Sequence, residues 1–94
     1  MAITVMKPKD EKQLGTTQLN IIIEGDKPEE LTTIETRQKV MQFARALGFP
    51  ASGLGAVPSP YPVDAEGKTD EELVLGKRPM KCWQAEYLVN AGLR

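Results

Sequence analysis

The side chains that most often carry chemistry in proteins are scarce in this sequence. It has no histidine and a single cysteine, Cys82. Without histidine, the commonest general base, the commonest metal ligand and the usual activator of a Ser or Cys nucleophile are missing. One thiol cannot supply the several soft or imidazole ligands that a zinc or transition-metal site needs. We therefore expect no catalytic residues, no cofactor and no metal, and rank an enzyme third, behind two binding hypotheses.

Three patterns that could still suggest chemistry have simpler explanations. Cys82 lies in an apolar stretch, where a buried and unreactive thiol is typical, although Lys81 and Arg78 are near it in sequence. Residues 69–72 read Thr-Asp-Glu-Glu, which is the capping-box pattern of a helix start. Residues 52–55 read Ser-Gly-Leu-Gly, which lacks the rest of a phosphate-binding loop and predicts a turn. The residues of greater interest are those that could bind a partner.

Residues 79–91 hold the single Trp and the single Cys of the chain and are unusually apolar. Pro79 suits the first position of a helix, and Gly92 suits the residue just past its end. At a helical period, Trp83 and Tyr87 share one stripe, and a second apolar stripe lies nearly opposite. The pattern predicts a helix that is either enclosed by its own domain or half covered by a partner.

Both interpretations of that stripe stay open at the level of sequence. Trp83 and Tyr87 could pack into the core. They could also form a docking surface flanked by Lys77, Arg78 and Lys81, because aromatic and Arg side chains are the usual anchors of such surfaces. Symmetric self-association through the same stripe, giving a homodimer, is a further alternative.

The rest of the chain supplies the elements that such a helix would need. Alternation of apolar and polar residues predicts short strands over 2–6 and 16–24, paired as an antiparallel hairpin. A capping box at 32–35 and the helical period that follows predict a helix over 33–47. Arg37 lies inside the apolar arc of this helix, so it either snorkels outward or pairs with a carboxylate at an interface.

Residues 50–69 are rich in Pro and Gly and predict a long extended connection. Its stretch 57–63 favours polyproline II, and Tyr61 within it either pins the connection to the domain or meets a partner. The capping box that follows predicts a short helix over 70–75.

Together these elements predict one domain, residues 1–94, of the α+β class. A small antiparallel sheet of two or three strands packs against two main α-helices, and the short third helix and the long Pro/Gly-rich loop close one end. The composition, 40% hydrophobic and 27% charged, is that of a globular chain.

The formal net charge of −1 conceals two acidic clusters. Glu29 and Glu30 precede the first long helix, while Asp70, Glu71 and Glu72 begin the short one. One interpretation is that each cluster is simply a solvated surface segment. The other is that the two clusters together bind a basic surface on a partner protein.

These features favour a non-enzymatic protein-interaction module. It would be a minor subunit of a larger assembly, or a small inhibitor of the phage or mobile-element type that occupies a host protein surface. The alternative is a DNA-binding protein that resembles a helix-turn-helix over residues 70–91, although the acids at its start would repel phosphates. The chain has no apolar run of membrane-spanning length, no secretory signal and one Cys, so we expect a cytoplasmic protein without a membrane partner.

Overall fold

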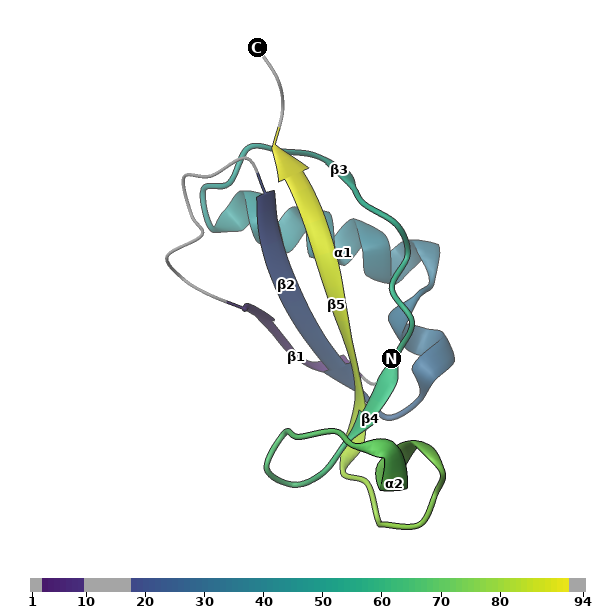
Figure 1. The fold of residues 1–94 in the computed structure, drawn as a ribbon. Helices are drawn as coiled ribbons and strands as arrows, with labels where there is room; N and C mark the ends of the chain where they lie inside the picture. The colour runs from purple at the N-terminus through teal and green to yellow at the C-terminus, as the bar shows by residue number, and fades with distance from the viewer. Residues whose placement is uncertain (1–2, 10–17, 92–94) are drawn as a thin grey trace.

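The computed structural model describes residues 3–9 and 18–91 of the chain. Over these residues it shows a five-stranded antiparallel sheet with one long helix across one face (Figure 1). The strands are β1 (Ile3–Pro8), β2 (Gln18–Gly25), β3 (Ala51–Leu54), β4 (Tyr61–Val63) and β5 (Cys82–Ala91). The helical segments are the 3₁₀ turn η2 (Pro28–Leu31), the long helix α1 (Ile34–Ala46) and the short helix α2 (Glu71–Val74).

β5 lies at the centre of the sheet, although it is the last described strand along the chain. It pairs with β2 from Gln18 opposite Asn90 to Gly25 opposite Trp83. On its other side, β3 pairs with the end of β5 and β4 pairs with its beginning. β1 pairs with the outer side of β2. The two short strands therefore share one edge of the sheet, and β1 forms the other.

The predicted helix over residues 79–91 is wrong, because most of this segment is β5. Its residues Trp83, Ala85, Tyr87 and Val89 all belong to the core under α1 or pack against it. These residues are spaced two apart, which puts all four on one side of a strand, whereas on a helix they would fall into two opposite stripes, Trp83 with Tyr87 and Ala85 with Val89. Long-range pairing decides between the two, because β2 needs a backbone partner on its second side.

This correction changes the fold class. The protein is mostly sheet, with five strands and one main helix in the described residues, and not two main helices packed on a small sheet. The five-stranded sheet joins more backbone amides and carbonyls between residues distant in sequence than the predicted two-stranded hairpin would join.

The predicted antiparallel pairing of the two N-terminal strands is confirmed by β1 and β2. Residues 2, 16 and 17 of the predicted strands lie outside the described residues. β1 continues through Pro8, which the edge position permits because an edge strand needs no donor on its outer side. Its register shifts between Ile3 and Val5, which is a β-bulge or irregularity.

The predicted helix over 33–47 is confirmed as α1, but its N-cap is Thr33, one residue after the Thr32 of the predicted capping box. The Thr33 hydroxyl accepts a hydrogen bond from the Thr36 amide at 3.1 Å. Ile34, the first residue of the helix, is 67% exposed. The buried residues of α1 are Thr36, Val40 and Ala44.

One apolar core fills the space between α1 and the sheet. Each fully buried aliphatic side chain in such a core contributes roughly 1.5–3 kcal/mol to folding. Its buried residues are Leu19, Ile21, Ile23, Leu31, Val40, Ala44, Phe49, Ala51, Ala85, Tyr87 and Val89.

The predicted irregular connection over 50–69 contains β3 and β4, and the turn predicted at 52–55 is largely β3. The Gly55 amide donates to the Leu88 carbonyl at 2.8 Å. A Cβ added at Gly55 would lie 3.4 Å from the Leu88 side chain. This distance is ordinary van der Waals contact, so residue 55 lies against the Leu88 side chain of β5.

The predicted short helix over 70–75 is confirmed as α2. Asp70 caps it by accepting from the Leu73 amide at 2.9 Å, and Leu73 is buried. Gly76 has φ +75°, and the Lys77 amide donates to the Glu72 carbonyl at 2.8 Å, which closes the helix in a Schellman motif. Residues 64–81, called the α2 lobe below, extend from one end of the sheet beside β4 (Figure 1).

Candidate interaction surface

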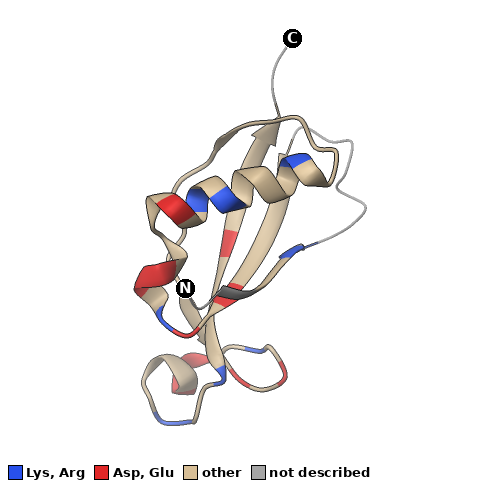
Figure 2. Ribbon diagram, turned by 180° about the vertical axis from the view of Figure 1, so that it is seen from behind, with Lys and Arg blue, Asp and Glu red and all other residues tan. Residues whose placement is uncertain are grey.

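The cross-strand register divides the side chains of the sheet between two faces. Ile21 lies opposite Tyr87 and Ile23 opposite Ala85, and all four are buried in the core beneath α1. The alternate residues of the same strands point to the other face. Figure 1 shows this second face toward the viewer with α1 behind it, and Figure 2, seen from behind, shows α1 crossing in front of the strands. Among the described residues, no helix crosses this second face, which we call the open face.

The open face has a small apolar centre with polar residues around it. Val5, Ile22 and Leu88 are half-buried there. Register places Lys7, Ile22 and Glu86 in one row across three strands. This arrangement of an apolar centre and a charged rim is typical of protein–protein interfaces. The polar residues of the face are Lys7, Lys9, Gln18, Asn20, Glu24, Tyr61, Gln84, Glu86 and Asn90.

A hydrogen-bonded row fixes three of these polar side chains. The Tyr61 hydroxyl donates to Gln84 Oε1 at 2.7 Å, and Gln84 Nε2 donates to Glu24 Oε2 at 2.9 Å. Gln84 is only 9% exposed, so its amide is held in one orientation. Burial raises the pKa of Tyr61, and the carboxylates of Glu86 and Glu24 raise it further. The row therefore keeps a neutral phenol beside an oriented carboxylate, which preorganises this part of the face for binding.

An ion pair also runs across the strands on this face. Lys9 Nζ lies 3.1 Å from Glu86 Oε1, which joins the end of β1 to β5 across β2. Both side chains remain partly exposed, so the pair adds little to stability. Its effect is to set the positions of two charges on the surface.

The two aromatic residues predicted to form a docking stripe lie on the opposite, covered face. Tyr87 is 1% exposed, and its hydroxyl donates to the Leu31 carbonyl at 2.6 Å. Trp83 is half-buried and packs against the same core. The structure thus places both side chains under or beside α1, away from the open face.

Arg37 also has an internal partner. Its guanidinium donates to the Thr32 carbonyl at 3.1 and 3.3 Å, which neither predicted alternative anticipated. Over residues 3–9 and 18–91, Arg37 forms no ion pair with a carboxylate. The neighbouring Thr36 hydroxyl donates to the Glu30 carbonyl at 2.6 Å. With Tyr87 on Leu31, side chains satisfy three successive carbonyls where η2 joins α1. Burial raises the pKa of Tyr87, while Arg37 acts in the opposite direction.

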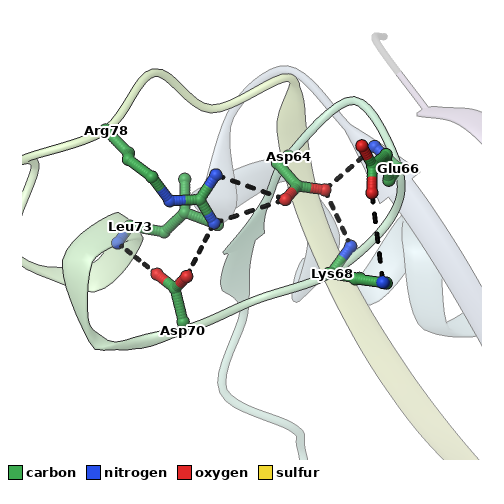
Figure 3. Close-up of polar contacts among 6 residues, drawn as sticks. All are labelled: Asp64, Glu66, Lys68, Asp70, Leu73 and Arg78. Carbon is green, nitrogen blue, oxygen red and sulfur yellow. Dashed lines mark hydrogen bonds and ion pairs between the residues drawn. The ribbon is translucent and has the colours of Figure 1, made fainter.

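Arg78 organises the α2 lobe (Figure 3). It lies 3.3 Å from Asp64 Oδ2 and 2.7 Å from Asp70 Oδ2. Asp64 also accepts from the amides of Glu66 and Lys68. The pKa of Asp64 is lowered chiefly by the Lys68 amide and that of Asp70 chiefly by the Leu73 amide, with Arg78 adding to both. Arg78 is therefore committed to a contact within the chain.

The other charged residues singled out from the sequence lie on the surface. Lys77 and Lys81 are exposed on the α2 lobe. Glu29 and Glu30 lie in η2, whereas Glu71 and Glu72 lie in α2 with Asp70 as its N-cap. Figure 2 shows these two elements apart from each other. Asp70 is occupied as a cap and an ion-pair partner. The exposed acids of the predicted patch are Glu29, Glu71 and Glu72, and Glu30 is half-buried.

Cys82 lies at the start of β5 and is buried. Burial raises the pKa of its thiol, and Glu24 raises it further, whereas Lys81 lowers it. A reactive thiolate needs a lowered pKa. In the described parts of the chain, no group of three or more His, Cys, Asp or Glu residues is placed to hold a metal ion.

Sequence reasoning missed most of the open face. The available signal was the period of two in β5, where Gln84, Glu86 and Asn90 alternate with buried residues. Within residues 3–9 and 18–91, no helix is long and apolar enough to cross a bilayer. No family model, curated protein or solved structure matches the chain.

Proposed function

We propose that this protein is a non-enzymatic interaction module that binds another folded protein on its open face. The observation that carries the proposal is the sheet with α1 on one face and, on the other, an apolar centre ringed by fixed polar side chains. In the described residues, Ile22 and Leu88 are half-buried on this face, and no helix crosses it. A protein surface is the ordinary partner of such a face.

The edges of the sheet are poorer binding sites than the face. β1 has an irregularity between Ile3 and Val5 and ends in Lys7 and Pro8. The opposite edge is interrupted between β3 and β4, and its connection contains Pro58 and Pro60. Irregular register, proline and lysine all discourage the addition of a further strand. Binding through backbone pairing is therefore disfavoured relative to binding through side chains of the face.

The charges of the face favour protein over nucleic acid. Lys7 and Lys9 are balanced by Glu24 and Glu86, whereas affinity for nucleic acid depends on an excess of cations. The helix-turn-helix alternative needs a recognition helix over residues 79–91, and that segment is largely β5. The partner that fits the face is a flat surface with an apolar centre and charges of both signs around it.

A role as a minor subunit or as an inhibitor that occupies a protein surface is consistent with this proposal. The high pKa and burial of Cys82 support a role without covalent chemistry. A cytoplasmic location is part of the proposal and draws on the single free cysteine.

Site-specific photo-cross-linking in cells that naturally make the protein tests the proposal. A photoreactive phenylalanine analogue replaces Lys7, which is exposed at the margin of the open face. The matched control replaces Gln42, which is exposed on α1. We expect a discrete cross-linked protein from position 7, resistant to nuclease and absent from position 42. No discrete product from position 7, or a product that nuclease removes, would overturn the proposal.

A further inference from the structure

We infer that the partner on the open face is a second copy of this chain, docked face to face about a twofold axis. This inference rests on the proposed function, because it identifies the partner of the same surface. The observation behind it is the central row of the face, Lys7–Ile22–Glu86, which is complementary to itself.

The register fixes the order of this row. Lys7 lies opposite Ile22 on one side, and Glu86 lies opposite Ile22 on the other. Adjacent strands are about 4.8 Å apart, so the cation and the carboxylate flank the isoleucine at similar distances. The row thus reads positive, apolar, negative from the edge of the sheet to its centre.

A twofold axis that runs parallel to β2, between the two sheets and over the Ile22 side chain, turns this order into complementarity. Face-to-face sheets pack about 10 Å apart with their strands within about 30° of each other. Rotation about that axis places Ile22 against the partner's Ile22. It also places Lys7 against the partner's Glu86, and the partner's Lys7 against Glu86. A symmetric interface repeats each contact, so one complementary pair becomes two.

The ion pair within each chain supports the same arrangement. Lys9 already lies 3.1 Å from Glu86 and holds its carboxylate on the open face. In the dimer, each Glu86 lies between Lys9 of its own chain and Lys7 of the other. Exclusion of water by the opposed Ile22 side chains strengthens both attractions.

Glu24 is the charged residue of β2 on the open face, so an axis along β2 could bring the two Glu24 carboxylates of the dimer near each other. The amide of Gln84 holds the Glu24 carboxylate toward β5, away from the axis. Tyr61 in turn holds Gln84, so the hydrogen-bonded row separates the two like charges. The inclination between packed sheets displaces the rows beyond the centre further.

Charge reversal on opposite partners tests the inference directly. Lys7→Glu and Glu86→Lys each place two like-charge pairs in a homodimer. An equimolar mixture of the two variants restores both attractive pairs in the heterodimer. We expect wild type to sediment as a reversible dimer, each variant alone to raise the dissociation constant by about tenfold or more, and the mixture to recover dimers. Gln42→Glu, on the exposed side of α1, is the control that leaves the dimer unchanged.

Three further results are decisive. Ile22→Asp places two buried carboxylates on the axis and should give a monomer with an unchanged circular dichroism spectrum. This variant also serves if Glu86→Lys fails to fold. Wild type that sediments as a monomer at every concentration would overturn the dimer. The same holds if the mixed variants fail to associate. Neither result would affect the proposed function, provided that position 7 still cross-links a protein of a different mass.

Discussion

The two faces of the sheet are made by alternate residues of the same strands, yet they are held by different forces. On the covered face, Ile21 and Ile23 meet Tyr87 and Ala85 in an apolar core. On the open face, Ile22, which follows Ile21 in sequence, lies beside the Lys9–Glu86 ion pair and the hydrogen-bonded row of Glu24, Gln84 and Tyr61. Most of the buried apolar contact that stabilises the fold therefore lies on the covered face. The residues of the open face contribute less to folding. Substitutions at matched positions on the two faces can test this division.

Adjacent isoleucines give the largest expected contrast. Ile21→Ala removes a fully buried side chain beneath α1 and should lower the free energy of unfolding by about 2–5 kcal/mol. Ile22→Ala removes the same atoms from the half-buried open face and should cost under about 1 kcal/mol in the monomer. Urea denaturation at low protein concentration measures both. Equal losses at the two positions would show that the open face is part of the core.

Removal of the two tyrosine hydroxyls should show the same difference in stability between the faces, with smaller losses than at the isoleucines. Tyr87→Phe leaves the Leu31 carbonyl without its buried donor and should cost about 1–3 kcal/mol. Tyr61→Phe removes a donor from the partly exposed Gln84 row and should cost less, about 0.5–1.5 kcal/mol. Thermal denaturation of the two variants, compared with wild type, ranks them. A larger loss at Tyr61 would contradict the division between the faces.

The α2 lobe differs from both faces of the sheet, because ion pairs between Arg78 and the carboxylates of Asp64 and Asp70 connect its parts. The folded pKa values of Asp64 and Asp70 lie below their unfolded values, which are about 4. Such groups stabilise the folded form above the unfolded pKa, and this contribution is lost as pH falls through the folded pKa. We therefore expect the amide of Leu73 to lose protection from hydrogen exchange below about pH 4, before the amides of β2 and β5 do.

The variant Arg78→Ala should move this loss of protection toward neutral pH, because it removes a cation from both carboxylates. Lys77→Ala is its control, since Lys77 is exposed on the same lobe. Simultaneous exchange of the lobe and the sheet would contradict a separately stabilised lobe.

The smallest expected effect concerns the ion pair on the open face. Lys9→Ala should change the free energy of unfolding by less than about 1 kcal/mol, because both partners are exposed to solvent. A double-mutant cycle with Glu86→Ala isolates the pair, and its coupling should fall as salt is added. A coupling above that range, or one indifferent to salt, would show that this part of the face is already shielded from water.

The elements with local signals were predicted well from the sequence. The apolar period of residues 33–47 indicated α1, and Thr-Asp-Glu-Glu at 69–72 indicated α2, although the N-caps are Thr33 and Asp70, each one residue after the start of its predicted capping box. Hydrophobic alternation identified β2 and its pairing with β1. Each of these depends on neighbours along the chain or on a hairpin partner close in sequence.

The largest failure concerns β5 and what it pairs with. Trp83 and Tyr87 are four residues apart, which suits a helix, but they are also on the same side of a strand. Only pairing with β2, far away in sequence, distinguishes the two. Because the helix was wrong, the candidate binding residues were sought on what proved to be the core face. The open face, including Gln84 and Glu86, was invisible without β5.

The central place of β5 also determines when the protein can fold during synthesis. Without residues 82–91, β2 has only β1 beside it, and β3 and β4 have no strand to pair with. A lone two-stranded hairpin is marginal in water. During synthesis, Leu19, Ile21 and Ile23 therefore precede the strand that completes their core, and the sheet can close only after β5 has been made. This is a high-contact-order route, so the domain should fold more slowly than its size alone suggests.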